Sequence, residues 1–311
     1  MIAVTGAKGF IGKALLPLLL CKGATVRAFI RKSERGLGLN SGVQYIDGDL
    51  SSPSDWAKIL EPGCILIHLA YSGKTPAKVA LEETRVMIEA CAAAGIKRLV
   101  HCSSVAVFGQ SSESELNENS KCRPSGYYAN TKLAIERMIL SSVAERFETV
   151  IVRPTSIVGE GGETLLKLIS DLTSKPRWMN YLRSCLFNGR PTHLISIDSI
   201  VLGLWECSSL ALTVCVDVVI LSNDEDPLNN FRCVEAIVMK ELGLPSYPWP
   251  PIRIPVQILK IVLFLMGRGI TNPSVRFVGS HLSRRCLSNP RDLKPAIKKF
   301  VRSTKNKVIR R

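Results

Sequence analysis

Short runs of β-branched and aliphatic residues alternate with longer segments of helical periodicity through the first half of the chain. The apolar runs predict strands, which we place near residues 1–5, 24–30, 43–47, 64–69, 97–103 and 148–153. Apolar residues spaced three and four apart predict helices near residues 10–22, 54–60, 76–94 and 127–145. This alternation is typical of βαβ units, so the sequence predicts an α/β fold with a doubly wound parallel sheet.

The regular alternation fades after Pro154, where Pro- and Gly-rich pieces separate a few helices. This change predicts a smaller C-terminal substrate-binding region. A buried strand expected at 215–221 would return the chain to the sheet. The predicted organisation is a first domain at 1–155 completed by 195–222, a substrate-binding region at 156–194 and 223–293, and a basic tail at 294–311.

No segment of the sequence is apolar enough to predict a transmembrane helix. The longest apolar run, 256–266, is interrupted by Lys260 and is shorter than the roughly 20 residues that span a bilayer. We expect a buried or lid helix there, in preference to a membrane-surface helix. The chain begins directly with a strand pattern and no signal-peptide pattern, which predicts a cytoplasmic protein.

The net charge of +15 is unevenly distributed. Residues 294–311 carry eight Lys and Arg residues and no acid, which predicts a solvated, poorly ordered end in preference to a nucleic-acid or lipid contact. The ten cysteines are scattered without paired Cys or His spacing. They are therefore expected to be reduced, and no metal site is predicted. No nucleic-acid partner is predicted either.

Glycines mark the junction between the first strand and the first helix. Gly6 allows a tight turn, Gly9 allows the backbone to approach a pyrophosphate, and Gly12 allows the helix to pack on the strand. The helix N-terminus offers unpaired N–H groups to the phosphates. The turn predicts a Rossmann-like dinucleotide site, and its expected contacts are Gly6, Gly9, Phe10, Ile11 and Gly12.

The residue after the second strand reads the adenosine ribose in dinucleotide folds. Here it is Arg31, nineteen residues after Gly12. A guanidinium matches a 2′-phosphate and the usual acid is absent, so NADP(H) is favoured, and NAD(H) stays possible. Further expected cofactor contacts follow the third and fourth strands, at Asp49, Leu50, Leu69 and Ala70.

A tyrosine and a lysine four residues apart begin the helix expected at 127–145. Tyr128 and Lys132 share one helix face, where the ammonium and an oxidised nicotinamide would favour the phenolate of Tyr128. Ser104, after the fifth strand, would hydrogen-bond the substrate oxygen, and Lys132 would hold the nicotinamide ribose. Tyr127 and Ser103 are the competing residues, with Tyr127 lying off the best face.

Several segments together resemble the extended short-chain dehydrogenase/reductase family. Within it the chain is most similar to the NAD-dependent epimerase/dehydratase group, which includes UDP-glucose 4-epimerase and bacterial 4-keto-sugar reductases of polysaccharide synthesis. The segments that carry the resemblance are TGAKGFIG at 5–12, Asp-Gly-Asp-Leu at 47–50, His-Leu-Ala at 68–70, SSVAVFG at 103–109, YYANTK at 127–132 and VRPTSIVG at 152–159.

The resemblance implies that Ser104 is the catalytic serine, Tyr128 the acid/base and Lys132 its partner, with Pro154 bordering the nicotinamide. Three positions depart from the family pattern. Phe108 replaces a common tyrosine, Ala80 a usual asparagine, and Ser156 an asparagine that epimerases often use near the substrate phosphate. The expected substrate contacts are Ser104, Ser156, Arg190 and Arg276.

The resemblance implies hydride transfer at C4 of a nucleotide sugar of the UDP-hexose type, as 4-keto reduction or 4-epimerisation. The alternative is an NADPH-dependent reductase of a small or lipid-like carbonyl, similar to dihydroflavonol reductases. A non-catalytic sensor is a third reading, against which the complete Ser/Tyr/Lys set argues. The helices at 76–94 and 127–145 are expected to form a homodimer interface, as is common in the family.

Overall fold

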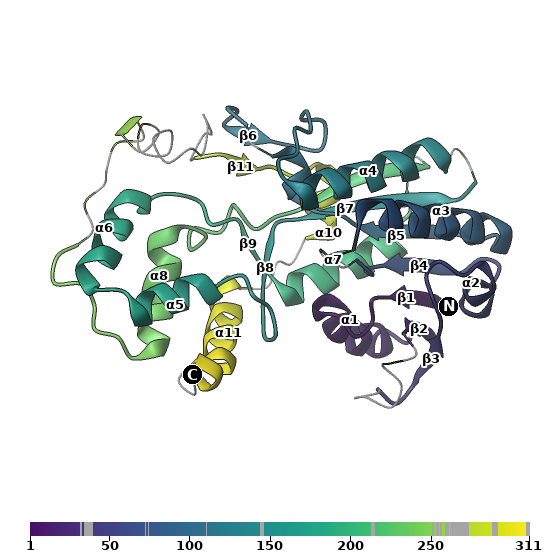
Figure 1. The fold of residues 1–311 in the computed structure, drawn as a ribbon, viewed down its shortest axis with the longest axis horizontal. Coiled ribbons are helices and arrows are strands. Elements are labelled where there is room, and N and C mark those ends of the chain that lie inside the picture. The colour runs from purple at the N-terminus through teal and green to yellow at the C-terminus, as the bar shows by residue number, and fades with distance from the viewer. Residues whose placement is uncertain are drawn as a thin grey trace.

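Seven parallel strands form the central sheet of the protein (Figure 1). The computed structural model describes residues 1–31, 33, 40–71, 73, 75–109, 111–143, 146–212, 215–250, 252, 255, 257–258, 261, 274–287 and 292–308. The strand order is β10-β7-β5-β4-β1-β2-β3. In chain order these are β1 (Ile2–Thr5), β2 (Val26–Ile30), β3 (Val43–Asp47), β4 (Ile65–His68), β5 (Arg98–Cys102), β7 (Glu148–Pro154) and β10 (Val216–Leu221).

Helices cover both faces of the sheet, which confirms the predicted doubly wound architecture. One face packs on α1 (Phe10–Cys21) and α7 (Ile197–Ser209). The other face packs on α2 (Pro53–Ile59), α3 (Ala77–Ala94) and α4 (Tyr127–Ser142). Neighbouring strand residues alternate between the two cores, as Ala3 and Val4 do, because successive side chains of a strand point to opposite faces.

The strand expected at 215–221 is confirmed. β10 pairs in parallel with β7 at the edge of the sheet, from Val216 opposite Thr149 to Leu221 opposite Pro154. The chain therefore leaves the sheet after β7 and returns to it. The division of the remaining residues into a substrate-binding region stays a prediction.

A second group of helices has its own hydrophobic core and lies beside the sheet, on the left in Figure 1. The group consists of α5 (Leu166–Ser174), α6 (Arg177–Phe187), α8 (Phe231–Leu242) and α11 (Leu293–Val308). Two short parallel pairs lie near this junction: β8 (Ser156–Val158) with β9 (Leu194–Ser196), and β6 (Glu115–Leu116) with β11 (Arg276–Phe277). Two further short helices in the described part of the chain are η2 (Val105–Phe108) and α10 (His281–Cys286).

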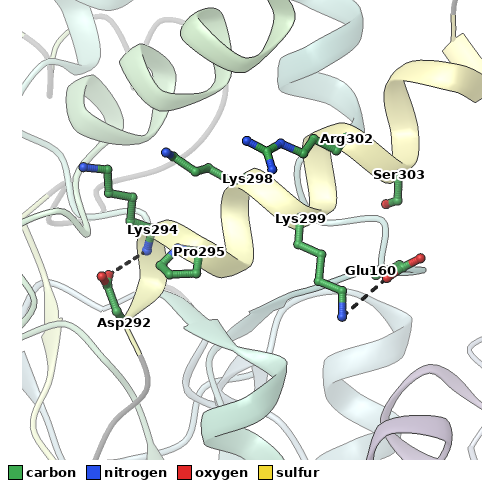
Figure 2. A pocket seen from close by; sticks show the side chains of 8 residues that line it. All are labelled: Glu160, Asp292, Lys294, Pro295, Lys298, Lys299, Arg302 and Ser303. Atoms are coloured by element: carbon green, nitrogen blue, oxygen red, sulfur yellow. Dashed lines mark hydrogen bonds and ion pairs between the residues drawn. The ribbon is translucent and has the colours of Figure 1, made fainter.

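The prediction of a poorly ordered basic end is wrong for residues 294–308, which belong to α11. Leu293, Ile297, Phe300 and Val301 are fully buried against the second core, because their spacing places them on one face of α11. The lysines obscured this apolar stripe in the sequence. They lie on the outer side of the helix, where Figure 2 shows Lys299 paired with Glu160.

The apolar run at 256–266 lies mostly outside the described residues, so the helix expected there stays untested. Among the helices that the structure describes, none combines the length and the apolarity needed to cross a bilayer. The described residues also contain no group of three or more His, Cys, Asp or Glu side chains arranged to hold a metal ion.

Two buried histidines stack side by side within the sheet, with ring centroids 5.4 Å apart. His68 on β4 shares a hydrogen bond of 2.7 Å with the hydroxyl of Thr5, while neither ring nitrogen of His101 has a partner among the described residues. Burial lowers the pKa of His68 to about 3 and lowers that of His101 well below its usual value. Both rings are therefore neutral in the folded protein at neutral pH.

These histidines should make the fold sensitive to mild acid. Between pH 6.5 and 3 the unfolded chain binds more protons than the folded chain, so the free energy of unfolding falls as the pH is lowered. From pH 7 to pH 5, His68 alone should remove about 2 kcal/mol, and His101 acts in the same direction. Urea unfolding across pH 5–8 measures the slope, and His68→Asn should flatten it. An equal slope in parent and variant would contradict this origin.

Candidate functional site

The turn between β1 and α1 is shaped so that only glycine fits at two positions. Gly6 has a φ of +68°, and a side-chain carbon there would come within 2.8 Å of the backbone nitrogen of Ala70. At Gly12 such a carbon would lie 2.3 Å from the carbonyl oxygen of Gly6. α1 begins after Gly9 with no side-chain cap, so its first amides can serve an anionic ligand. The turn therefore fits the pyrophosphate of a dinucleotide.

A cavity of about 640 Å³ extends from this turn along the carboxyl edge of the sheet. The expected cofactor contacts that line it are Gly6, Gly9, Arg31, Asp49, Leu50, Leu69 and Ala70. The end of β4 is fixed to β1 because the hydroxyl of Thr5 accepts hydrogen bonds from the amides of Leu69 and Ala70, both at 3.2 Å. These seven residues are thus brought together in one place, with the size and the polar groups that a nucleotide needs, whereas Gly12 lines neither this cavity nor the one that holds the predicted catalytic residues. We call this space the nucleotide cavity.

A second cavity, of about 570 Å³, contains the predicted catalytic residues. Ser104, Tyr128, Lys132 and Pro154 all line it, together with Phe10 and Ile11 from the start of α1. The two cavities share two lining residues, Leu69 and Tyr71. We call the second space the catalytic cavity.

Local structure positions each member of the catalytic set. Ser104 follows β5 and caps η2 by accepting a hydrogen bond of 3.2 Å from the amide of Ala106. Tyr128 and Lys132 lie one turn apart in the first turns of α4. Because β5 and α4 are both anchored in the core of the sheet, the three side chains are held on rigid elements.

The Lys132 ammonium is fully buried, which lowers the pKa of this lysine. Its Nζ donates a hydrogen bond of 2.9 Å to the carbonyl oxygen of Cys102 and lies 4.2 Å from the ring centre of Tyr71. Burial raises the pKa of Tyr128, and a hydrogen bond with Ser104 opposes this effect. In the protein chain alone, the pKa of Tyr128 is therefore displaced upwards, opposite to the direction expected from a neighbouring ammonium, because desolvation of the phenol dominates.

The structure distinguishes the two competing residues, Tyr127 and Ser103, from each other. Tyr127 is 54% exposed and donates a hydrogen bond of 3.1 Å to the carbonyl oxygen of Thr75, whereas Tyr128, which is itself 41% exposed, lines the catalytic cavity. Ser103 does line the cavity beside Ser104. Its hydroxyl is buried and has no hydrogen-bond partner among the described residues. The structure thus separates the two tyrosines and keeps both serines at the site.

The predicted substrate contacts are more scattered. Ser156 is exposed on β8, next to the cavity residues Thr155 and Ile157. Arg190 follows α6, where its guanidinium lies over the ring of Phe187, and Arg276 is exposed on β11. Neither arginine is among the residues that line the catalytic cavity, and Ser156 is not among them either.

Several residues that line the catalytic cavity were missed in the sequence, among them Tyr71, Glu163 and Thr164. Glu163 and Thr164 reach the catalytic cavity from the turn before α5, directly after the family motif at 152–159. Tyr71 directly follows Leu69 and Ala70, two predicted cofactor contacts. Its position just after the end of β4 could have indicated that it also lies at the site. The positive φ of His193, 51°, is a further feature that a sequence does not show.

Comparison with known proteins identifies relatives of the first half of the chain. The family model of the NAD dependent epimerase/dehydratase family matches residues 2–176. A 4-hydroxy-2-methyl-3-oxo-4-farnesyl-3,4-dihydroquinoline-1-oxide ketoreductase of Stigmatella aurantiaca is 31% identical over 192 residues, 57% of each chain. A putative dihydroflavonol 4-reductase of Synechocystis is 34% identical over 169 residues, 50% of this chain and 49% of the relative. The chain therefore spans about half the length of these curated relatives.

Solved structures resemble the whole chain. The Bordetella bronchiseptica enzyme WbmH, solved in complex with NAD+, superposes with a TM-score of 0.71 at 17% identity and covers 97% of both chains. A UDP-galactose 4-epimerase superposes with a TM-score of 0.68 at 19% identity and covers 99% of both. At this level of identity, the likeness establishes the fold.

Proposed function

Because the chain belongs to the NAD-dependent epimerase/dehydratase family, we propose that it is an NAD(P)-dependent oxidoreductase or epimerase acting at C4 of a UDP-hexose-type nucleotide sugar. One observation carries the proposal. Ser104, Tyr128 and Lys132 line a single cavity that shares a wall with the nucleotide cavity. A proton donor and a dinucleotide site are therefore adjacent, which is what carbonyl reduction requires.

The residues of the chain handle the proton and the orientation of the substrate. A bound nicotinamide dinucleotide would supply or accept the hydride. In the reductive direction Tyr128 donates its phenolic proton to the substrate oxygen, and its raised pKa keeps the phenol protonated at neutral pH. Ser104 donates a hydrogen bond to the same oxygen. Lys132 stabilises the phenolate that remains and would hold the nicotinamide ribose.

A second candidate is an NADPH-dependent reductase of a small or lipid-like carbonyl. The walls of the catalytic cavity favour it, because Phe10, Ile11, Leu69 and Ile157 are apolar and neither Arg190 nor Arg276 lines the cavity. Several curated relatives also carry the names of enzymes for apolar substrates, among them a sterol-4-alpha-carboxylate 3-dehydrogenase of Mus musculus at 28% identity.

A substrate panel separates the two candidates. UDP-sugars, their 4-keto intermediates and apolar ketones are incubated with NADH or NADPH, and the products are identified by NMR. A reductase consumes the cofactor in proportion to product, while an epimerase shows no net consumption. Binding of UDP by calorimetry supports the sugar substrate. If the protein does not bind UDP and turns over an apolar ketone, the second candidate replaces the nucleotide-sugar function.

We further propose that NADP(H) is the preferred cofactor, because Arg31 lines the nucleotide cavity beside the end of β2. Arg31→Ala should lower kcat/KM for NADPH by roughly 10–100-fold, since a charge-assisted hydrogen bond contributes about 1.5–3 kcal/mol, and should leave NADH little changed. Arg85→Ala, which removes an exposed arginine paired with Glu82, is the matched control. Equal losses with both cofactors would contradict a 2′-phosphate contact.

We also propose that the protein is a cytoplasmic homodimer joined through α3 and α4. Both helices present exposed apolar side chains, Val79 on α3 and Leu140 on α4. Light scattering of the purified protein measures the assembly. A dimer that becomes monomeric on Leu140→Arg supports the interface, and a dimer that this change leaves intact would place it elsewhere.

A further inference from the structure

Tyr71 occupies the wall between the two cavities. It follows Ala70 at the carboxyl end of β4 and lines both the nucleotide cavity and the catalytic cavity. Its ring centre lies 4.2 Å from Nζ of Lys132 and 5.6 Å from the ring centre of Tyr128, with the two rings at 66°. One side chain therefore touches both members of the proposed proton-transfer pair.

The Lys132 ammonium needs such a neighbour. It carries three N–H donors, and its one hydrogen bond among the described residues goes to the carbonyl oxygen of Cys102. A buried cation with unfilled donors is costly, which is why burial lowers the pKa of Lys132. The face of an aromatic ring attracts a cation, and this attraction strengthens when water is excluded.

The other titratable groups around Lys132 offer little compensation. His68 and His101 are neutral because burial lowers the pKa of both. Burial raises the pKa of the Cys102 thiol, which therefore stays protonated at neutral pH, and Tyr128 is a neutral phenol for the same reason. Glu136 raises the pKa of Lys132, but its carboxylate is bound to Arg153 through two hydrogen bonds.

We propose that Tyr71 is a positioning residue whose ring face holds the Lys132 ammonium in place at the wall of the catalytic cavity, one helical turn from Tyr128. The role of Lys132 in turnover rests on the proposed function, whereas the contact between ring and ammonium does not. The ring, and not the hydroxyl, carries the effect. The Tyr71 hydroxyl is buried and has no partner in good hydrogen-bond geometry among the described residues. Burial raises the pKa of Tyr71, and the Thr131 side chain opposes this effect only in part.

Two substitutions separate the ring from the hydroxyl. Tyr71→Phe keeps the ring face, and Tyr71→Leu removes it. The ionisation of Lys132 is followed in the full chain, without substrate or cofactor, from the NMR shift of its Cε, which is assigned by its loss in Lys132→Met. We expect the pKa of Lys132 to fall by roughly 0.4–1.5 pH units in Tyr71→Leu and to stay at the parent value in Tyr71→Phe.

Kinetics provide the second readout. At neutral pH we expect kcat to fall by roughly 2–30-fold in Tyr71→Leu, with the alkaline limb of the pH profile moved to lower pH. Tyr71→Phe should restore both. A merely structural role would instead lower the melting temperature without moving the titration of Lys132. If Tyr71→Leu does not fold, Tyr71→Met, which retains bulk without a ring, takes its place.

The outcomes distinguish this proposal from the proposed function. An unchanged titration of Lys132 in the ring-less variant, or an equal change in Tyr71→Phe, overturns the positioning role even if the chain reduces carbonyls. If no substrate of the panel is turned over but the pKa of Lys132 falls in Tyr71→Leu as expected, the proposed function is overturned. The contact between ring and ammonium is then still established.

Discussion

Replacing Tyr128 by phenylalanine is expected to lower kcat by roughly 10²–10⁴-fold, the range over which a positioned acid/base contributes to catalysis. The substitution removes the hydroxyl, with its proton and its hydrogen bond to Ser104, and keeps the ring. The Tyr128 ring packs edge-on against Tyr71, a contact that phenylalanine preserves. Steady-state kinetics with the carbonyl substrate found in the panel measure the loss, and KM should change far less than kcat because the ring still shapes the cavity.

Tyr127→Phe is the matched control. Its hydroxyl is also at the start of α4, but it donates to the carbonyl oxygen of Thr75 and the residue is exposed. This variant should retain activity within about a factor of two, since no reacting group is removed. Full turnover by Tyr128→Phe would remove this tyrosine from the mechanism. A loss shared equally by the two variants would point instead to a general disturbance of the helix start.

The sheet and the nucleotide cavity were predictable because their signals are local. Alternating apolar runs fix strands within a few residues, and the spacing of Gly6, Gly9 and Gly12 reflects a turn whose backbone admits no side chain at Gly6 or Gly12. The order of these strands in the sheet then brings Arg31, Asp49 and Leu69 to one edge. The strand order was predictable as well, because consecutive strands and helices are usually neighbours in space.

The features that escaped prediction depend on contacts between distant segments. Tyr71 is one more aromatic residue in the sequence, and only the folded structure shows that its ring faces the Lys132 ammonium. The apolar stripe of α11 is masked by lysines until a core exists for it to cover. The upward displacement of the pKa of Tyr128 likewise reflects burial, which the spacing of Tyr128 and Lys132 does not reveal.

Breaking the buried ion pair between Arg153 and Glu136 is the second change for which we expect a large effect. Arg153 on β7 donates two hydrogen bonds to Glu136 on α4, of 3.1 and 2.7 Å, and both side chains are buried. The guanidinium also lies 5.0 Å from the ring centre of Phe108 on η2. The pair therefore ties α4, which carries Tyr128 and Lys132, to the strand that ends at Pro154.

Glu136→Gln is expected to lower the free energy of unfolding by about 3–5 kcal/mol, because it leaves the Arg153 charge buried without a counter-charge. Chemical unfolding measures the loss. Glu82→Gln, which breaks the exposed pair with Arg85, should cost less than about 1 kcal/mol. The double variant Glu136→Leu with Arg153→Met removes both charges and should recover most of the stability, since well-packed apolar residues can replace a buried pair. If the double variant is no more stable than Glu136→Gln, the loss arises from packing at α4, and the unpaired charge is not its cause.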